Sequence, residues 1–229
     1  MDQAGADGGR ERLPRATVTR LPSYLLALDG LWSEGVTLTS SQELATLAGV
    51  SPEQLRKDLS FLGSYGRRGV GYDVVHLRSR IGAVLGLERV NRVVIVGVGH
   101  LGHALAAYGG FADRGFRVVG LVDDSPDVVG TVVAGLVVRP SAELAEVVAA
   151  GGATIGVVAT PAAVAQQVAD GLVAAGITGI LTFAPTTLQV PEGVGVRNVD
   201  VASELQLLAF HGRTRMPVGP AEGVEPAND

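Results

Sequence analysis

The sequence predicts an α/β protein of two domains, and three observations support this. Short helices with strong N-terminal caps follow one another between residues 40 and 62, and a Gly- and Arg-rich segment comes directly after them. From Arg92 onward, apolar strands alternate with Ala-rich helices. A G-x-G-x-x-G motif begins at Gly97, between the first of these strands and the next helix. These patterns are typical of a winged helix-turn-helix domain followed by a Rossmann-type domain with a parallel sheet.

Changes in composition along the chain set the expected boundaries. The first and last segments are rich in Gly, Pro and acidic residues and cannot bury an apolar core. We expect a disordered tail at 1–15, a winged-helix domain at 16–89, a Rossmann domain at 90–200, a C-terminal helix at 201–215 and a second disordered tail at 216–229.

Composition also narrows the class of protein. The chain has 229 residues, of which 47% are hydrophobic, so it is long enough for two cores. It has no Cys, which excludes disulfides, thiolate zinc sites and a Cys nucleophile and favours a reducing compartment. The longest uncharged run, 147–169, is broken by Gly151, Gly152 and Pro161, and no apolar signal region begins the chain. We therefore expect a cytoplasmic protein without a membrane span.

The net charge of −5 is unevenly distributed. Residues 1–89 carry 11 basic and 10 acidic side chains, whereas residues 90–229 carry 7 and 13. Because phosphate responds to local charge, the overall negative sign does not exclude DNA binding by the first half.

Helical periodicity and caps predict three helices before Gly63, and a connecting helix with Leu77, Ile81, Val84 and Leu85 follows later and ends at Gly86. The first lies behind Pro22, a residue favoured at a first helical position. Its apolar positions are Leu21, Tyr24, Leu25, Leu28, Leu31 and Trp32. Ser40-x-x-Glu43 begins a second helix as a capping box, and in the third helix Ser51 is the cap and Gln54 closes the box. Two short helices joined across Gly49 indicate a helix-turn-helix.

The third helix is the expected recognition helix. Leu55, Leu59 and Leu62 form an apolar stripe that can pack inward, while polar side chains lie off this stripe. Lys57, the only lysine of the chain, is among them. In a helix-turn-helix the second helix enters the major groove, so we expect these polar side chains to face DNA.

A β-wing is predicted after the recognition helix, because the segment 63–74 combines several glycines with Arg67 and Arg68. Such a basic tip can reach phosphates or a narrow minor groove. The expected DNA contacts are Ser51, Gln54, Arg56, Lys57, Ser60, Arg67, Arg68 and Tyr72.

The second half reads as a doubly covered parallel sheet. Its expected strands are 93–96, 118–122, 154–159, 177–182 and 194–199. Continuous apolar strands interleaved with helices are buried on both faces, as in Rossmann-type folds.

The glycine motif predicts a dinucleotide site. Gly97 permits the tight turn, Gly99 lets the backbone approach a pyrophosphate, and Gly102 lets the helix pack on the strand. Asp123 ends the next strand, where a carboxylate can accept both ribose hydroxyls of an adenosine. Since no basic residue follows Asp123 closely, a 2′-phosphate would be repelled, and we expect NAD(H) rather than NADP(H). The loop residues are Gly97, Val98, Gly99, His100, Leu101 and Gly102.

Together these motifs resemble those of a known family, the Rex redox-sensing transcriptional repressors of bacteria. The resemblance runs from about Arg20 to Phe210. It is carried by the recognition-helix motif QLRKDLS from Gln54, the wing motif YGRRGVGY from Tyr65, the glycine loop, and ILTFAP from Ile180. His100, Ser125 and Thr182 depart from residues that are frequent at these positions in the family.

The resemblance implies a homodimer with exchanged C-terminal helices that binds operator DNA. It implies that NADH binding releases the DNA, whereas NAD⁺ binds without effective release. It also implies that Tyr108 and Asp200 form the switch at the nicotinamide end of the pocket. The loops lining that pocket would contribute Thr160, Pro161, Ala184 and Pro185.

Ring charge gives a physical basis for this discrimination. The oxidised nicotinamide is cationic and the reduced ring is neutral, so an apolar pocket disfavours the oxidised form. A ligand can shift an equilibrium only by its differential affinity for the two states.

Two alternatives remain open. A winged-helix regulator could respond to another adenine nucleotide such as coenzyme A, because a fold alone does not select its ligand. An NAD-dependent dehydrogenase is the weaker alternative, because no catalytic constellation follows Asp200. We expect no catalytic residue and no metal site: His100 and His103 are read as solvated loop residues.

Overall fold

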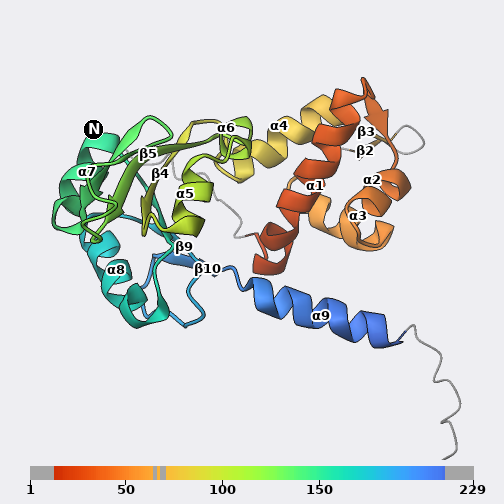
Figure 1. The fold of residues 1–229 in the computed structure, drawn as a ribbon. Coiled ribbons are helices and arrows are strands. Elements are labelled where there is room, and N and C mark those ends of the chain that lie inside the picture. The colour runs from red at the N-terminus through yellow and green to blue at the C-terminus, as the bar shows by residue number, and fades with distance from the viewer. Residues whose placement is uncertain (1–12, 64–65, 68–70, 215–229) are drawn as a thin grey trace, which may run out of the picture. The chain divides into compact units, whose positions relative to one another are not determined.

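The computed structural model describes residues 13–63, 66–67 and 71–214. The chain divides into two compact units, Met1–Val90 and Asn91–Asp229, and each is described by itself (Figure 1). The elements of the first unit are α1 (Arg15–Ser33), β1 (Leu38–Thr39), α2 (Ser41–Leu47), α3 (Pro52–Ser60), β2 (Gly66–Arg67), β3 (Gly71–Asp73) and α4 (Val74–Val84).

The elements of the second unit are β4 (Asn91–Val96), α5 (His100–Ala106), α6 (Gly110–Asp113), β5 (Phe116–Asp123), β6 (Val132–Val133), β7 (Leu136–Pro140), the 3₁₀ turn η1 (Ser141–Glu143), α7 (Leu144–Gly151), β8 (Ile155–Val158), α8 (Ala162–Ala174), β9 (Gly179–Thr182), β10 (Gly195–Asn198) and α9 (Val201–Thr214).

The first unit has the predicted winged-helix architecture. Its helices enclose one apolar core, and its strands form an antiparallel sheet in the order β1-β3-β2. The core side chains are Leu21, Tyr24, Leu28, Leu31, Leu44, Ala45, Leu55, Leu59, Leu62, Tyr72, Val74, Leu77 and Ile81. The sequence prediction missed β1, a two-residue strand that pairs with β3 and completes the wing sheet.

The start of the first helix was predicted incorrectly. Helix α1 begins at Arg15, so Pro22 lies inside it and not at its first position. Proline removes one backbone donor there, but the buried stripe of Thr17, Leu21 and Tyr24 runs through this turn and is present only if the chain stays helical. Packing of this stripe thus overrides the preference of proline for the first position of a helix.

The two predicted caps are present, with one difference. Ser40 Oγ accepts a hydrogen bond from Glu43 N at 3.1 Å, and Ser51 Oγ accepts one from Gln54 N at 3.2 Å. The Gln54 side chain does not close the second capping box, however. Its Nε2 donates to Asp58 Oδ1 at 3.0 Å, because a buried carboxylate is a stronger acceptor than the alternatives nearby.

The second unit has a mostly parallel sheet in the order β10-β9-β8-β4-β5-β7-β6. The five predicted strands are β4, β5, β8, β9 and β10, and they pair in parallel. One face packs against α7 and α8 through Val94, Val122 and Leu172, and the other packs toward α5 through Ile95 and Leu121 (Figure 1). The sheet is therefore covered on both faces, as a Rossmann-type fold requires.

The sequence prediction missed the hairpin of β6 and β7. These strands are joined by Ala134 and Gly135, whose φ values of 50° and 80° both lie in the left-handed region. This is the geometry of a type I′ turn, which Ala rarely adopts, so the turn had no clear sequence signal. Strand β7 pairs in parallel with the end of β5, up to Asp123, and widens the sheet on that side.

The last described element of the second unit is α9, whose described side chains from Val201 to Phe210 are all exposed. No described helix is both long and apolar enough to cross a bilayer. The predicted tails at residues 1–12 and 215–229 lie outside the described residues.

Candidate functional site

The glycine turn follows β4 at the point where the strand order reverses. Strand β4 pairs with β5 on one side and with β8 on the other, which makes this the switch point of the sheet. In open α/β sheets, ligands bind at the carboxyl ends of the strands at such a point.

Gly97 and Gly102 are required by the protein's own packing. Gly97 has φ +92°, and a Cβ there would lie 2.7 Å from Ala159 O. A Cβ on Gly102 would lie 1.8 Å from Gly97 O. These two glycines therefore allow the turn and the close approach of α5 to β4, as predicted from their spacing.

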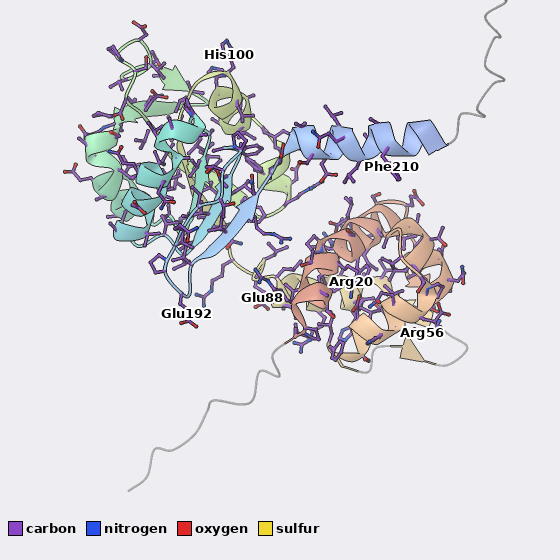
Figure 2. The ribbon with its side chains drawn as sticks, turned by 90° about the horizontal axis from the view of Figure 1, so that it is seen from below. Arg20, Arg56, Glu88, His100, Glu192 and Phe210 are labelled. Atoms are coloured by element: carbon purple, nitrogen blue, oxygen red, sulfur yellow. The ribbon has the colours of Figure 1, made fainter. Side chains whose placement is uncertain are left out.

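Gly99 differs from the other two glycines. Its backbone is extended, with φ −66° and ψ −163°, and a Cβ there would meet nothing within 4 Å. No part of the chain therefore requires glycine at this position. The open space lies at the N-cap of α5, where the orphan N–H groups of a helix attract an anion. Figure 2 shows His100, the next residue, directed outward at the start of this helix.

Asp123 lies at the end of β5 and is tied to the glycine turn. Its Oδ2 accepts a hydrogen bond from Val98 N at 2.6 Å, and its Oδ1 accepts one from Ser125 N at 2.7 Å. Each carboxylate oxygen has a second lone pair that these bonds do not use. The carboxylate is thus fixed in orientation and keeps the capacity to accept two further donors.

The loops after β8 and β9 meet the same edge of the sheet. Thr160 follows β8, and its Cγ2 would lie 2.8 Å from a Cβ on Gly97. Pro161 is the N-cap of α8, and Ala184 and Pro185 follow β9. Thr182 is fully buried, and its Oγ1 accepts a hydrogen bond from Ala184 N at 3.1 Å, which holds this loop.

These features fit a dinucleotide. In the part of the chain that the structure describes, Thr160 Oγ1 is buried without a hydrogen-bond partner, although buried hydroxyls are normally satisfied. This orphan hydroxyl lies beside the turn that holds Gly97, and Gly99 leaves open space next to the helix N-terminus. A bound dinucleotide would supply acceptors for the Thr160 hydroxyl and for the N–H groups at the helix N-terminus.

Tyr108 and Asp200 are not joined by a hydrogen bond in the described residues of this single chain. Tyr108 is 54% exposed, and its ring packs edge to face on that of Phe111, with ring centroids 5.2 Å apart. Asp200 caps α9: it accepts from Ala202 N and Ser203 N and from the Ser203 hydroxyl. Hydrogen bonds from Ser203, and to a lesser extent from Ala202, lower the pKa of Asp200.

The exposed side of α3 carries residues that the sequence predicts to contact DNA. Arg56, Lys57 and Ser60 are exposed, and Figure 2 shows Arg56 at the surface of the first unit. Arg56 Nη1 donates to Ser41 Oγ at 3.1 Å and Nη2 pairs with Glu53 at 3.1 Å. The arginine is therefore braced between the N-termini of α2 and α3, the part of a helix-turn-helix that meets DNA.

The predicted wing contacts are only partly within the described residues. The backbone of Arg67 pairs with Gly71 in the β2–β3 ladder, whereas Arg68 lies outside the described residues. Tyr72 is only 9% exposed and belongs to the core, and burial raises its pKa. Its ring is thus mainly a packing group.

Sequence reasoning missed Asp58. This carboxylate is 1% exposed, yet it accepts hydrogen bonds from Thr17, Arg20 and Tyr24 of α1 and from Gln54 of α3. Its bond to Arg20 is bidentate, at 2.6 and 2.7 Å. An acidic residue in a polar helix gives no sequence signal of burial, because its partners in α1 lie 34 to 41 residues earlier in the chain.

Burial alone would raise the pKa of Asp58, but the hydrogen bonds from Arg20, Tyr24 and Thr17 outweigh it and lower the pKa to about 2. Burial and the adjacent Asp58 raise the pKa of Tyr24 to about 12. Asp58 is therefore ionised and Tyr24 is neutral over the physiological range. The pair of helices α1 and α3 is joined by a fully satisfied buried network.

No cluster of three His, Asp or Glu side chains suited to a metal ion occurs among the described residues.

The two folds together define the class of winged-helix proteins that carry a Rossmann-type ligand domain. Residues 12–60 match the family described as putative DNA-binding protein N-terminus, and residues 88–186 match the CoA binding domain family. The redox-sensing transcriptional repressor Rex of Streptomyces avermitilis is 56% identical over 94% of this chain and 86% of its own length. That of Streptomyces coelicolor is 58% identical over 87% of this chain and 77% of its own length.

A solved structure has the same architecture. The crystal structure of RSP in complex with beta-NAD+ and operator DNA is 33% identical, with a TM-score of 0.82 over 88% of this chain and 93% of that one. The chain therefore belongs to the Rex family of redox-sensing transcriptional repressors, as its motifs predicted.

Proposed function

We propose that this chain is a cytoplasmic, non-catalytic transcriptional repressor that binds operator DNA as a homodimer and is released when NADH binds. Transcription of its targets then follows the NADH/NAD⁺ ratio. Both the DNA-binding and the NADH-binding part of this proposal are supported by one relative of known structure, since RSP was solved with beta-NAD+ and operator DNA and also with beta-NADH.

One observation carries the assignment of the ligand. Gly99 has room for a side chain, and the Asp123 carboxylate is held against the neighbouring Val98 N–H. A turn that keeps open space next to a helix N-terminus, beside an oriented carboxylate, is suited to a pyrophosphate followed by an adenosine ribose. In this proposal the six loop residues from Gly97 to Gly102 hold the pyrophosphate.

The remaining pocket residues extend the site toward the nicotinamide. The orphan hydroxyl of Thr160 is the strongest of these candidates, because a bound ligand would supply the partner that the chain does not. Pro161, Ala184 and Pro185 line the same edge of the sheet. They are largely apolar, which favours the neutral reduced ring over the cationic oxidised ring.

The DNA-binding half of the proposal rests on the exposed side of α3. Arg56 and Lys57 would contact phosphates, and Ser51, Gln54 and Ser60 would contact phosphates or base edges. Arg67 and Arg68 would reach the backbone or the minor groove from the wing, and Tyr72 would contribute mainly by supporting the wing sheet.

The C-terminal helix supports the homodimer. Val201, Leu205 and Leu208 recur along α9 at helical spacing and are 60%, 61% and 67% exposed. Exposed apolar side chains in such a row mark an interaction surface. We assign this surface to exchange with a second copy, which would bring Asp200 of one subunit to Tyr108 of the other.

A gel-shift experiment with NADH increasing at constant NAD⁺ tests the function. Selective loss of the DNA complex as NADH rises is expected, and an unchanged complex would refute the proposal. The same titration with NADPH and with coenzyme A tests the alternative effectors. Coenzyme A is included because residues 88–186 match the CoA binding domain family.

A further inference from the structure

A predicted base-reading side chain is bound by a buried carboxylate on its own helix. Gln54 is the third residue after the Ser51 cap of α3, in the first turn, which in a helix-turn-helix contacts base edges. Its Nε2 donates to Asp58 Oδ1 at 3.0 Å. The side chain of Gln54 is partly exposed, while Asp58 is 1% exposed.

The chemistry of the carboxylate determines which way the amide faces. An ionised carboxylate only accepts hydrogen bonds, so the NH₂ group of Gln54 must face it and the carbonyl must face elsewhere. Asp58 itself cannot turn, because Arg20 binds both of its oxygens and Tyr24 binds Oδ2 at 2.6 Å. The orientation of the Gln54 amide is thus set by helix α1.

We propose that Asp58 is a positioning residue for sequence specificity: it holds the Gln54 amide with Oε1 turned toward the DNA, so that this side chain selects an amino-bearing base. The proposal rests on the proposed function, because it requires α3 to enter the major groove. It adds a specificity role to a residue that makes no contact with DNA.

Bases with an amino group can be told apart from the other bases by the hydrogen-bonding groups that they present in the major groove. Adenine N6 and cytosine N4 are donors, whereas thymine O4 and guanine O6 are acceptors. A freely rotating glutamine can turn either end of its amide toward the groove and binds both classes. A glutamine held by Asp58 presents an acceptor, so adenine or cytosine is preferred on the contacted strand.

The first experiment identifies the base that Gln54 contacts. The full chain is used to select duplexes from a randomised library, and affinities are then measured for every single-base change in the selected site. The position at which Gln54→Ala abolishes discrimination is the position that Gln54 reads. In the wild type we expect adenine or cytosine there to be bound about tenfold more tightly than thymine or guanine, the value of one hydrogen bond.

The second experiment tests the role of Asp58. In Asp58→Asn the amide of Gln54 is no longer forced to one orientation, and the tenfold preference should shrink to about twofold at this position alone. Tyr24→Phe is the matched control, because it removes one hydrogen bond from the far oxygen of the same carboxylate and leaves the Gln54 contact in place. Its base preferences should equal those of the wild type.

Several outcomes would overturn the proposal. A preference for thymine or guanine at the Gln54 position would show that the amide nitrogen faces the DNA. An equal loss of affinity at all positions in Asp58→Asn would show a purely structural role. The base identity depends only on the wild type and Gln54→Ala, so a preference for thymine or guanine refutes the proposal even if Asp58→Asn does not fold. Failure of the wild type to select any sequence would instead refute the proposed function.

Discussion

The carboxylate of Asp123 accepts a hydrogen bond from the backbone N–H of Val98 at 2.6 Å. This bond joins the tip of the second strand of the Rossmann unit to the glycine turn after the first. We expect Asp123→Ala to weaken NADH binding by roughly 100- to 10,000-fold, because about two hydrogen bonds to a charged acceptor are lost. Calorimetric titration measures the change. Asp124→Asn is the control, and equal affinity in Asp123→Ala and the wild type would remove Asp123 from the site.

Substitution of Gly99 and of Gly102 should have different effects on stability and on NADH binding. Gly99→Ala should lower the free energy of unfolding by only about 1 kcal/mol, because Ala is a poorer N-cap than Gly although its Cβ meets nothing within 4 Å, yet it should reduce NADH affinity at least about tenfold. Gly102→Ala should instead destabilise the Rossmann unit by about 3 kcal/mol, since its Cβ would lie 1.8 Å from Gly97 O. Denaturant unfolding and NADH titration of both variants check this. Normal NADH binding by Gly99→Ala would contradict a pyrophosphate at this position.

Neutralising Arg56 and Lys57 together should abolish operator binding and leave NADH binding unchanged. Both side chains are exposed on α3. Each phosphate contact releases about one counterion from the DNA. Single variants should therefore make the slope of log K for DNA binding against log salt concentration less steep by about one. Arg114→Gln with Arg117→Gln removes the same charge from exposed positions of the other unit and serves as the control. A loss of NADH binding in the double variant would indicate misfolding instead.

The Asp58 network should make the winged-helix unit sensitive to acid. The folded-state pKa of Asp58 is about 2, below the ordinary value of 3.8, so the network stabilises the fold above pH 4 and is lost as the pH falls through 2. Asp58→Asn should therefore cost about 2 kcal/mol at pH 6, and the difference from the wild type should shrink toward pH 2.

Fluorescence of Trp32, the only tryptophan, reports unfolding of this unit because it lies on α1. A wild-type-to-variant difference that stays constant from pH 6 to pH 2 would show that the carboxylate contributes nothing through its charge.

Much of the fold could be predicted because its signals are local. Continuous apolar segments identified the five main strands, and Ser40 and Ser51 identified the caps of α2 and α3. The interior position of Pro22, by contrast, is set by packing along the whole of α1. Strands β1 and β6 have two residues each, too few for any periodicity to be recognised.

The local parts of the candidate sites could be predicted from the sequence, whereas the parts that depend on distant residues could not. The roles of Gly97 and Gly102 follow from spacing alone, because the turn and the helix packing are local. The burial of Asp58 and the turn of Gln54 toward it depend on side chains of α1, far away in the sequence. Sequence patterns report the period of an element, whereas a buried polar network depends on how distant elements meet.

Tyr108→Phe should blunt the release of DNA by NADH without preventing NADH binding. The Tyr108 ring packs edge to face on Phe111 at 5.2 Å, and this contact survives the loss of the hydroxyl, so the variant isolates the hydroxyl's role. Asp200→Ala is less selective, because Asp200 also caps α9 through Ala202 N and Ser203 N. The proposed switch needs the hydroxyl to bind Asp200 of a second subunit in one dimer state and not in the other. Only such a differential contact can shift the equilibrium, and about 1.4 kcal/mol gives a tenfold change.

Gel shifts at rising NADH measure the release directly, and calorimetry with NADH alone measures binding. We expect Tyr108→Phe to need roughly tenfold more NADH for half-release while its NADH affinity in the absence of DNA changes little. Ser203→Ala is the matched control, because it removes one hydrogen bond from Asp200 but leaves both backbone bonds of the cap. A wild-type release curve for Tyr108→Phe would show that the switch lies elsewhere in the pocket, since the hydroxyl is the only group that the substitution removes.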